Sequence, residues 1–102
     1  MTTEASSATS SARNRLRHVP RFRPGVYLRD RQGERLLLFP EGYMELDDIA
    51  WDILRLIDSQ RDVTTIVKIL ATQYQGAPTE IERDVLEFLD QLHRDGVLIW
   101  QS

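Results

Sequence analysis

The carboxylates are the side chains of this chain with the most evident capacity for chemistry. Two carboxylates held close together can divide acid and base catalysis between them. Here the acids fall where helices are expected to start, at Asp47, Asp48, Asp62, Glu80 and Glu82. An acid at such a place caps free backbone N–H groups and offsets the helix dipole. We therefore interpret these acids as structural, and we expect that the chain is not an enzyme by itself.

Other reactive groups are scarce. There is no cysteine, and the two histidines, His18 and His93, are too few for a typical histidine-based metal cage. We therefore predict no metal and no cofactor. His93 stands near the end of an expected helix, where it is either a dipole-compensating surface group or a binding contact. Ser59 follows Asp58 as in carrier proteins that accept a phosphopantetheine arm, but Gln60 stands where such carriers have leucine.

Length and composition indicate one small domain. The 102 residues begin without the apolar segment of a secretory signal. No apolar run approaches the roughly 20 residues that a membrane-spanning helix needs. We therefore expect a cytoplasmic protein that makes no use of a membrane.

Charge divides the chain into two parts. Residues 1–35 hold eight arginines and three acids, whereas residues 36–102 hold five basic residues and thirteen acids. Residues 1–18 are rich in Ser, Thr and Arg and lack a periodic apolar face. We predict a flexible tail there, which folding does not require, and a folded domain over residues 19–102. The arginines of residues 13–23 form either a solvated linker or an arm that docks on a partner or straps the acidic domain.

Three short strands are expected at the start of the domain. Residues 26–29 alternate as a strand does, and Gln32-Gly33 is typical of a hairpin turn. Residues 35–39 form a more apolar second strand. Pro40 and Gly42 suit the second and fourth positions of the next turn, which leads into a third strand over residues 43–46.

Three helices follow these strands. Asp47 and Asp62 are good N-caps for the first two, and residues 79–82 (Thr-Glu-Ile-Glu) have the pattern of a capping box for the third. The first helix is apolar on most sides and should be buried. Gly96 suits the left-handed position after the third helix, and residues 97–100 form a last extended segment. The pattern predicts a winged-helix-like α+β fold: a three-stranded antiparallel meander, three helices and a short C-terminal extended segment.

A winged-helix outline raises a DNA-binding regulator as the alternative function. A recognition helix normally carries Arg or Lys to approach phosphates. The third helix and the residue after it hold six acids against Arg83 and Arg94. DNA would repel such a helix, so we expect no nucleic acid among the partners.

Leu86 is the unusual residue of the third helix. It lies beside the core stripe that includes Val85 and Leu89, so it either widens the core or forms one wall of a groove. The opposite wall would be the third strand, residues 43–46, where an extended peptide could pair through main-chain hydrogen bonds. An exposed strand edge also allows a homodimer at high concentration.

The sequence resembles the pyrroloquinoline quinone (PQQ) biosynthesis protein D family, PqqD, from about Val19 to Trp100. The Pro-Glu-Gly turn followed at a fixed distance by Leu46 and Ala50 is its most specific part. Asp47 stands where the family often has Asn, Ser59 where it often has Gly, and Val97 where it often has Trp. The other matching residues are Leu37, Leu38, Phe39, Ile53, Leu54, Asp58, Val85, Phe88, Leu89 and Gly96.

The resemblance implies a peptide chaperone with a leader-recognition domain. Such proteins hold the ribosomally made precursor peptide of PQQ and present it to a radical S-adenosylmethionine enzyme, which cross-links a Glu and a Tyr of the peptide. In the wider family the leader adds as a strand beside the third strand and against the third helix. Carried over to this chain, the peptide-binding residues are Tyr43, Met44, Glu45, Leu46, Leu86, Leu89, Asp90 and His93.

Overall fold

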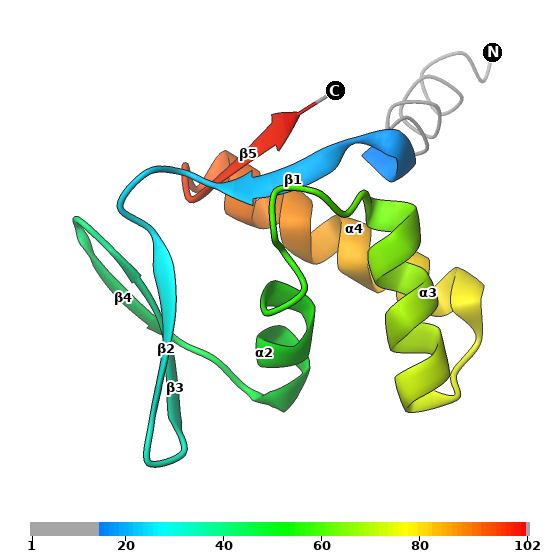
Figure 1. Ribbon diagram of the computed structural model, residues 1–102, viewed down its shortest axis with the longest axis horizontal. Helices are drawn as coiled ribbons and strands as arrows, with labels where there is room; N and C mark the ends of the chain where they lie inside the picture. The colour runs from blue at the N-terminus through cyan, green and yellow to red at the C-terminus, as the bar shows by residue number, and fades with distance from the viewer. Residues whose placement is uncertain (1–14, 102) are drawn as a thin grey trace, which may run out of the picture.

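The computed structural model describes residues 15–101, in which a small sheet stands to one side of three helices (Figure 1). The predicted tail of residues 1–18 lies outside this range except for its last four residues. In chain order the elements are the 3-10 helix η1 (Arg15–Arg17), β1 (Val19–Phe22), β2 (Tyr27–Arg31), β3 (Glu34–Phe39), β4 (Gly42–Glu45), α2 (Asp48–Leu54), α3 (Val63–Tyr74), α4 (Pro78–Arg94) and β5 (Leu98–Gln101).

The predicted meander is confirmed as an antiparallel sheet in the order β2-β3-β4. Gln32 and Gly33 take φ values of 55° and 87° between β2 and β3, the left-handed conformations of a tight hairpin turn. Pro40 and Glu41 form the short turn from β3 to β4, and Phe39 pairs with Gly42 across it. The sheet class and both turns therefore follow the prediction.

β1 is a strand in the segment, residues 13–23, where the sequence predicts an arginine-rich linker or arm. It pairs antiparallel with β5, and Pro20 at its centre is buried opposite Trp100. Figure 1 shows the two strands lying together beside α4. The predicted C-terminal extended segment is thus β5, one strand of a separate two-stranded sheet. Its partner, β1, comes from the N-terminal end of the described residues.

Residues 15–18 also pack on the domain, which corrects the tail prediction for these positions. The hydroxyl of Thr64 donates to the carbonyl of Leu16 at 2.9 Å. The N–H of Val63 donates to the carbonyl of His18 at 3.2 Å. The start of α3 therefore rests on the segment that leads into β1.

Two of the three predicted helix caps form. The carboxylate of Asp47 accepts from the N–H of Ala50 at 2.8 Å, and that of Asp62 from the N–H of Thr65 at 2.9 Å. The capping box at residues 79–82 was wrong, because the N-cap of α4 is Ala77, two residues before Thr79, and it makes no side-chain bond; the helix begins at Pro78. Proline suits the first turn because it has no N–H to satisfy.

Gly96 ends α4 in the predicted left-handed conformation, with φ of 80°. Its N–H donates to the carbonyl of His93, and the N–H of Val97 donates to that of Leu92. These two bonds form a Schellman motif, with the buried Leu92 and Val97 at its apolar contact positions. The motif turns the chain sharply from α4 into β5.

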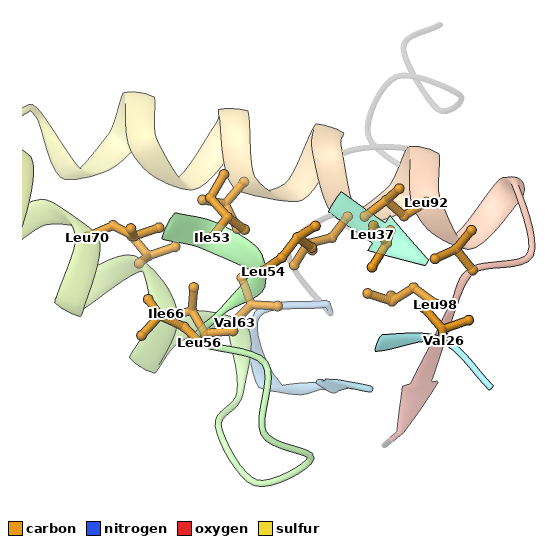
Figure 2. Packing of buried hydrophobic residues seen from close by; sticks show 14 residues of the cluster. Val26, Leu37, Ile53, Leu54, Leu56, Val63, Ile66, Leu70, Leu92 and Leu98 are labelled. Carbon is orange, nitrogen blue, oxygen red and sulfur yellow. The ribbon is translucent and has the colours of Figure 1, made fainter. Parts of the chain in front are cut away.

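One apolar core joins the sheet and the helices. In Figure 2, Leu37 of β3 lies near Leu92, Leu98 and Val26 at one end of the cluster, and Leu70 marks the other end between α3 and α2. No polar or charged residue in the described part is buried.

The first predicted helix, α2, is shorter and less enclosed than expected. It ends at Leu54, and Ile49 on its outer side is 61% exposed. Ile53 and Leu54 face the core, so only part of its apolar surface is buried.

Candidate functional site

The outer edge of β4 is the first feature of the candidate site. Within residues 15–101 no strand pairs with this edge. The N–H of Leu46 donates to the carbonyl of Arg35 on the β3 side at 3.0 Å. Because backbone groups alternate in direction along an antiparallel pair, Met44 also turns its N–H and C=O toward β3. Tyr43 and Glu45 therefore turn their main-chain groups toward the open edge.

The side chains of β4 alternate between two faces. Met44 pairs in register with the fully buried Leu37, so its half-buried side chain lies on the core face. Leu46 is half-buried as well. Tyr43 is 63% exposed on the opposite face, and Glu45 is exposed beside it. A strand added here would find an apolar face on one side and a polar aromatic face on the other.

A pocket of about 410 Å³ opens on the core face of β4, toward the segment that follows α4. The side chain of Arg23 donates to the carboxylate of Glu41 at 2.7 Å and joins the β1–β2 connection to the β3–β4 turn. This hydrogen bond lowers the pKa of the Glu41 carboxyl below its ordinary range. The lining residues are Arg23, Phe39, Glu41, Met44, Asp95 and Val97.

The predicted α4 residues lie at different depths. Leu86 is half-buried and packs on the core, and Asp90 is half-buried with its carboxylate 3.2 Å from the Arg94 guanidinium. His93 is exposed, and its Nδ1 donates to the Leu98 carbonyl at 3.0 Å. Leu89 has no exposed surface, so the prediction that it lines a peptide pocket needs correction. It supports this wall from inside the core.

The structure brings Met44 to the pocket but places none of the predicted α4 residues in its lining. Sequence reasoning missed five of the six lining residues: Arg23, Phe39, Glu41, Asp95 and Val97. Phe39 adjoins the Pro-Glu-Gly turn, which was itself a recognisable signal. Arg23 lay in a run of arginines, and only its ion pair with Glu41 distinguishes it from its neighbours.

Two features are absent from residues 15–101, a metal-ligand cluster and a membrane-spanning helix. No three His, Cys, Asp or Glu side chains of this range gather as metal ligands would. No helix of the same range has the length and apolar content needed to cross a membrane.

Comparison with known proteins places the chain among the relatives that its turn motif suggested. The family model described as Coenzyme PQQ synthesis protein D (PqqD) matches residues 34–98. The PqqA binding protein of Pseudomonas aeruginosa is 38% identical over 77 residues, which are 74% of this chain and 83% of that protein. The PqqA binding protein of Xanthomonas campestris pv. campestris is 38% identical over 81 residues, 78% of this chain and 88% of its own length.

Solved structures agree in fold. The solution structure of the PqqD truncation of Methylobacterium extorquens PqqCD is 38% identical, has a TM-score of 0.70, and covers 79% of this chain and 88% of its own. That protein is described as a functional, stand-alone recognition element for ribosomally synthesised and modified peptides. A lasso peptide synthetase B1 complexed with its leader peptide is 23% identical with a TM-score of 0.69, over 78% of this chain and 96% of its own, which shows a shared fold. The chain thus belongs to the PqqD family.

Proposed function

We propose that this chain is a peptide chaperone of PQQ biosynthesis, which binds the ribosomally made precursor peptide and presents it to a radical S-adenosylmethionine enzyme. The observation that carries the proposal is the open edge of β4, where Tyr43 and Glu45 offer main-chain groups beside the pocket that Met44 lines. An extended peptide gains affinity from such an edge through main-chain bonds, and specificity from pockets for alternate side chains.

Relatives support the ligand class. The Pseudomonas and Xanthomonas relatives are named for binding PqqA, and each is aligned over most of its own length with this chain. The PqqD truncation of the Methylobacterium relative is a functional recognition element on its own. The shared fold with the lasso peptide synthetase B1 is compatible with this class, although at 23% identity it carries fold alone.

The proposed peptide contacts divide between β4 and α4. The peptide backbone would bond to Tyr43 and Glu45, and its alternate side chains would contact Met44 and Leu46 on one face. On the α4 side the proposed contacts are Leu86, Asp90 and His93, with Leu89 beneath them.

The chain's role is recognition, and the chemistry belongs to the partner enzyme. Within residues 15–101, the three acids with a lowered pKa are engaged in structural bonds, such as the Asp62 cap on α3. The precursor is made on ribosomes, so the proposed place of action is the cytoplasm. The acids exposed on α4, such as Glu80 and Asp84, disfavour the DNA-binding alternative, since a phosphate backbone would be repelled there.

Amide NMR of the ¹⁵N-labelled protein, titrated with the precursor peptide, tests the proposal. We expect the largest shifts at residues 42–46 and 86–93, and small shifts along α3. Shifts confined to α3, or no shifts at saturating peptide, would contradict it. Mass spectrometry of the peptide after incubation with this protein alone should show an unchanged mass, and a cross-link formed in that sample would overturn the assignment of chemistry to the partner.

A further inference from the structure

A second hollow lies among the three α-helices, and the meander contributes no residue to it. Its volume is about 150 Å³. Its floor is formed by the buried Ile53, Leu70 and Val85, and its rim includes Ile49, 61% exposed, and Tyr74, 43% exposed. The side chains of Ile49 and Tyr74 are therefore partly exposed to water at the rim. The floor below them is concave and apolar.

The rim of this hollow is fixed by polar contacts. The carboxylate of Asp52 on α2 accepts from the hydroxyl of Tyr74 and from the side-chain amide of Gln73, both in the last turn of α3. The hydrogen bond to Asp52 raises the pKa of Tyr74 to about 12, so the hydroxyl remains a donor at alkaline as well as neutral pH. These hydrogen bonds thus fix the spacing between α2 and α3 at the rim.

The loop from α3 to α4 packs against Ile81, an α4 residue that lines the hollow. A Cβ added to Gly76 would lie 3.2 Å from Cδ1 of Ile81, so the glycine lets the loop rest directly on this lining residue. The hollow therefore has a set shape before anything enters it, which lowers the cost of ordering a ligand there.

The size of the hollow limits what fits. An apolar protein cavity of roughly 150 Å³ can hold a molecule of about the size of benzene. A single Phe or Leu side chain has that size and can enter through the open rim. A larger ring system would have to displace Ile49 or Tyr74.

The charged side chains around the hollow determine which charge a bound partner can carry. Asp84 belongs to the lining and makes no ion pair within residues 15–101. Asp52 accepts from the Tyr74 hydroxyl at the rim, and Asp48 directly precedes the rim residue Ile49. The side chain of Asp48 is 93% exposed where it pairs with Arg35, and an exposed pair compensates charge only weakly. The side chain of Asp52 is 17% exposed, and its contact with the exposed Arg55 is long, at 3.8 Å.

The helices that form the hollow, with the loops between them, also have a negative net charge. Residues 47–95 hold eleven acids and five basic residues. A basic partner would therefore be attracted to this part of the molecule, whereas an acidic partner would be repelled.

We infer that the hollow between α2, α3 and α4 docks a partner polypeptide that inserts one Phe- or Leu-sized side chain flanked by Lys or Arg. The inference goes beyond the proposed function, because the hollow shares no residue with β4 or with the pocket that Met44 lines. The two sites can be occupied together. A protein that holds one peptide at β4 thus retains a separate surface for a second polypeptide.

A short capped peptide with one Phe between two pairs of Lys is the probe. We would titrate it into the full chain, with the isoleucine methyl groups labelled for NMR, and follow Ile49, Ile53 and Ile81. Saturable shifts at these three methyl groups are expected. The same peptide with Ser in place of Phe, or with Glu in place of each Lys, should bind at least tenfold more weakly. Equal binding of all three peptides would overturn the inference.

Two matched variants locate the binding. Ile49→Lys places a positive charge on the rim, and Tyr27→Lys makes the same charge change at a residue of similar exposure on the meander, 61% against 57%. Ile49→Lys should weaken binding of the Phe-containing peptide at least tenfold, whereas Tyr27→Lys should weaken it less than twofold. Equal effects of the two variants, or shifts that map to β4, would refute the docking site.

The precursor peptide provides an independent readout on the same samples. Ile49→Lys should leave its affinity unchanged, because Ile49 is outside the β4 site. Weakened precursor binding in this variant would show that the two sites are one and overturn the inference. A chain that never binds the precursor would refute the proposed function and leave the result at the hollow standing.

Discussion

Replacing Glu45 by proline tests whether the open edge of β4 binds the precursor peptide. The N–H of Glu45 points to that edge, and proline has none to donate. Proline is tolerated on an edge strand where its missing N–H faces solvent, so the fold should remain intact. Met44→Pro is the contrasting change, because the N–H of Met44 points to β3 and its loss removes a bond of the sheet.

The expected loss can be worked from a single hydrogen bond. The bond itself contributes about 0.5–1.5 kcal/mol, and the peptide carbonyl left without a partner adds a desolvation cost of similar size. We therefore expect Glu45→Pro to weaken binding by about 2 kcal/mol, or roughly 30-fold in Kd. Glu45→Ala keeps the N–H and removes only an exposed side chain, so it should change Kd by less than about threefold.

Isothermal titration calorimetry of the precursor peptide with the wild-type chain, Glu45→Ala and Glu45→Pro measures these effects. Circular dichroism checks that each variant is folded. The reasoning is refuted if Glu45→Pro, folded like the wild type, binds as tightly as Glu45→Ala. Binding would then not use the main chain of β4.

Four further outcomes follow from the structure. Leu86→Asp should weaken precursor binding by about 1–3 kcal/mol, measured by calorimetry on folded protein, because it places an unpaired charge on the α4 wall. Deleting residues 1–14 should leave the melting temperature unchanged, whereas deleting residues 1–18 removes the contacts of Leu16 and His18 and should lower it by about 10 °C; a scanning calorimeter distinguishes the two. Hydrogen bonds lower the pKa of Glu41, Asp58 and Asp62 below their ordinary values of 4.5, 3.8 and 3.8, so the stability they contribute is complete above about pH 5 and is lost as the pH falls below 4; urea unfolding at several pH values would reveal a flat acid limb if these bonds were absent. Light scattering over a dilution series should show a monomer at low concentration and some dimer at high concentration, and a tight dimer with β4 paired would contradict the peptide site.

Local signals predicted the parts of the fold that depend on neighbouring residues. The meander, its two turns, the caps Asp47 and Asp62 and the end of α4 at Gly96 all rest on contacts a few residues apart. The start of α4 depended on two competing local signals. Thr79 offered a capping box, but Pro78 suits the first helical turn, and the N-cap lies two residues earlier, at Ala77.

The pairing of β1 with β5 has no such local signal. The two strands are separated by most of the chain, and β1 reads Val-Pro-Arg-Phe between other arginines. Composition therefore favoured a linker. What orders the segment is the burial of Pro20 and its contact with the far end of the chain, and neither can be read from a window of neighbouring residues.

The direction of the main-chain groups at the proposed site follows from the strand pattern. Main-chain groups of Tyr43 and Glu45, rather than reactive side chains, form the part of the site that would bind a peptide. Their direction is set by register: Leu37 must be buried, Met44 pairs with it, and the residues on either side of Met44 then face the open edge. Substitutions at Tyr43 or Glu45 that keep the N–H should therefore be tolerated better than a change at Leu37, which would shift the register and turn the wrong groups toward the peptide.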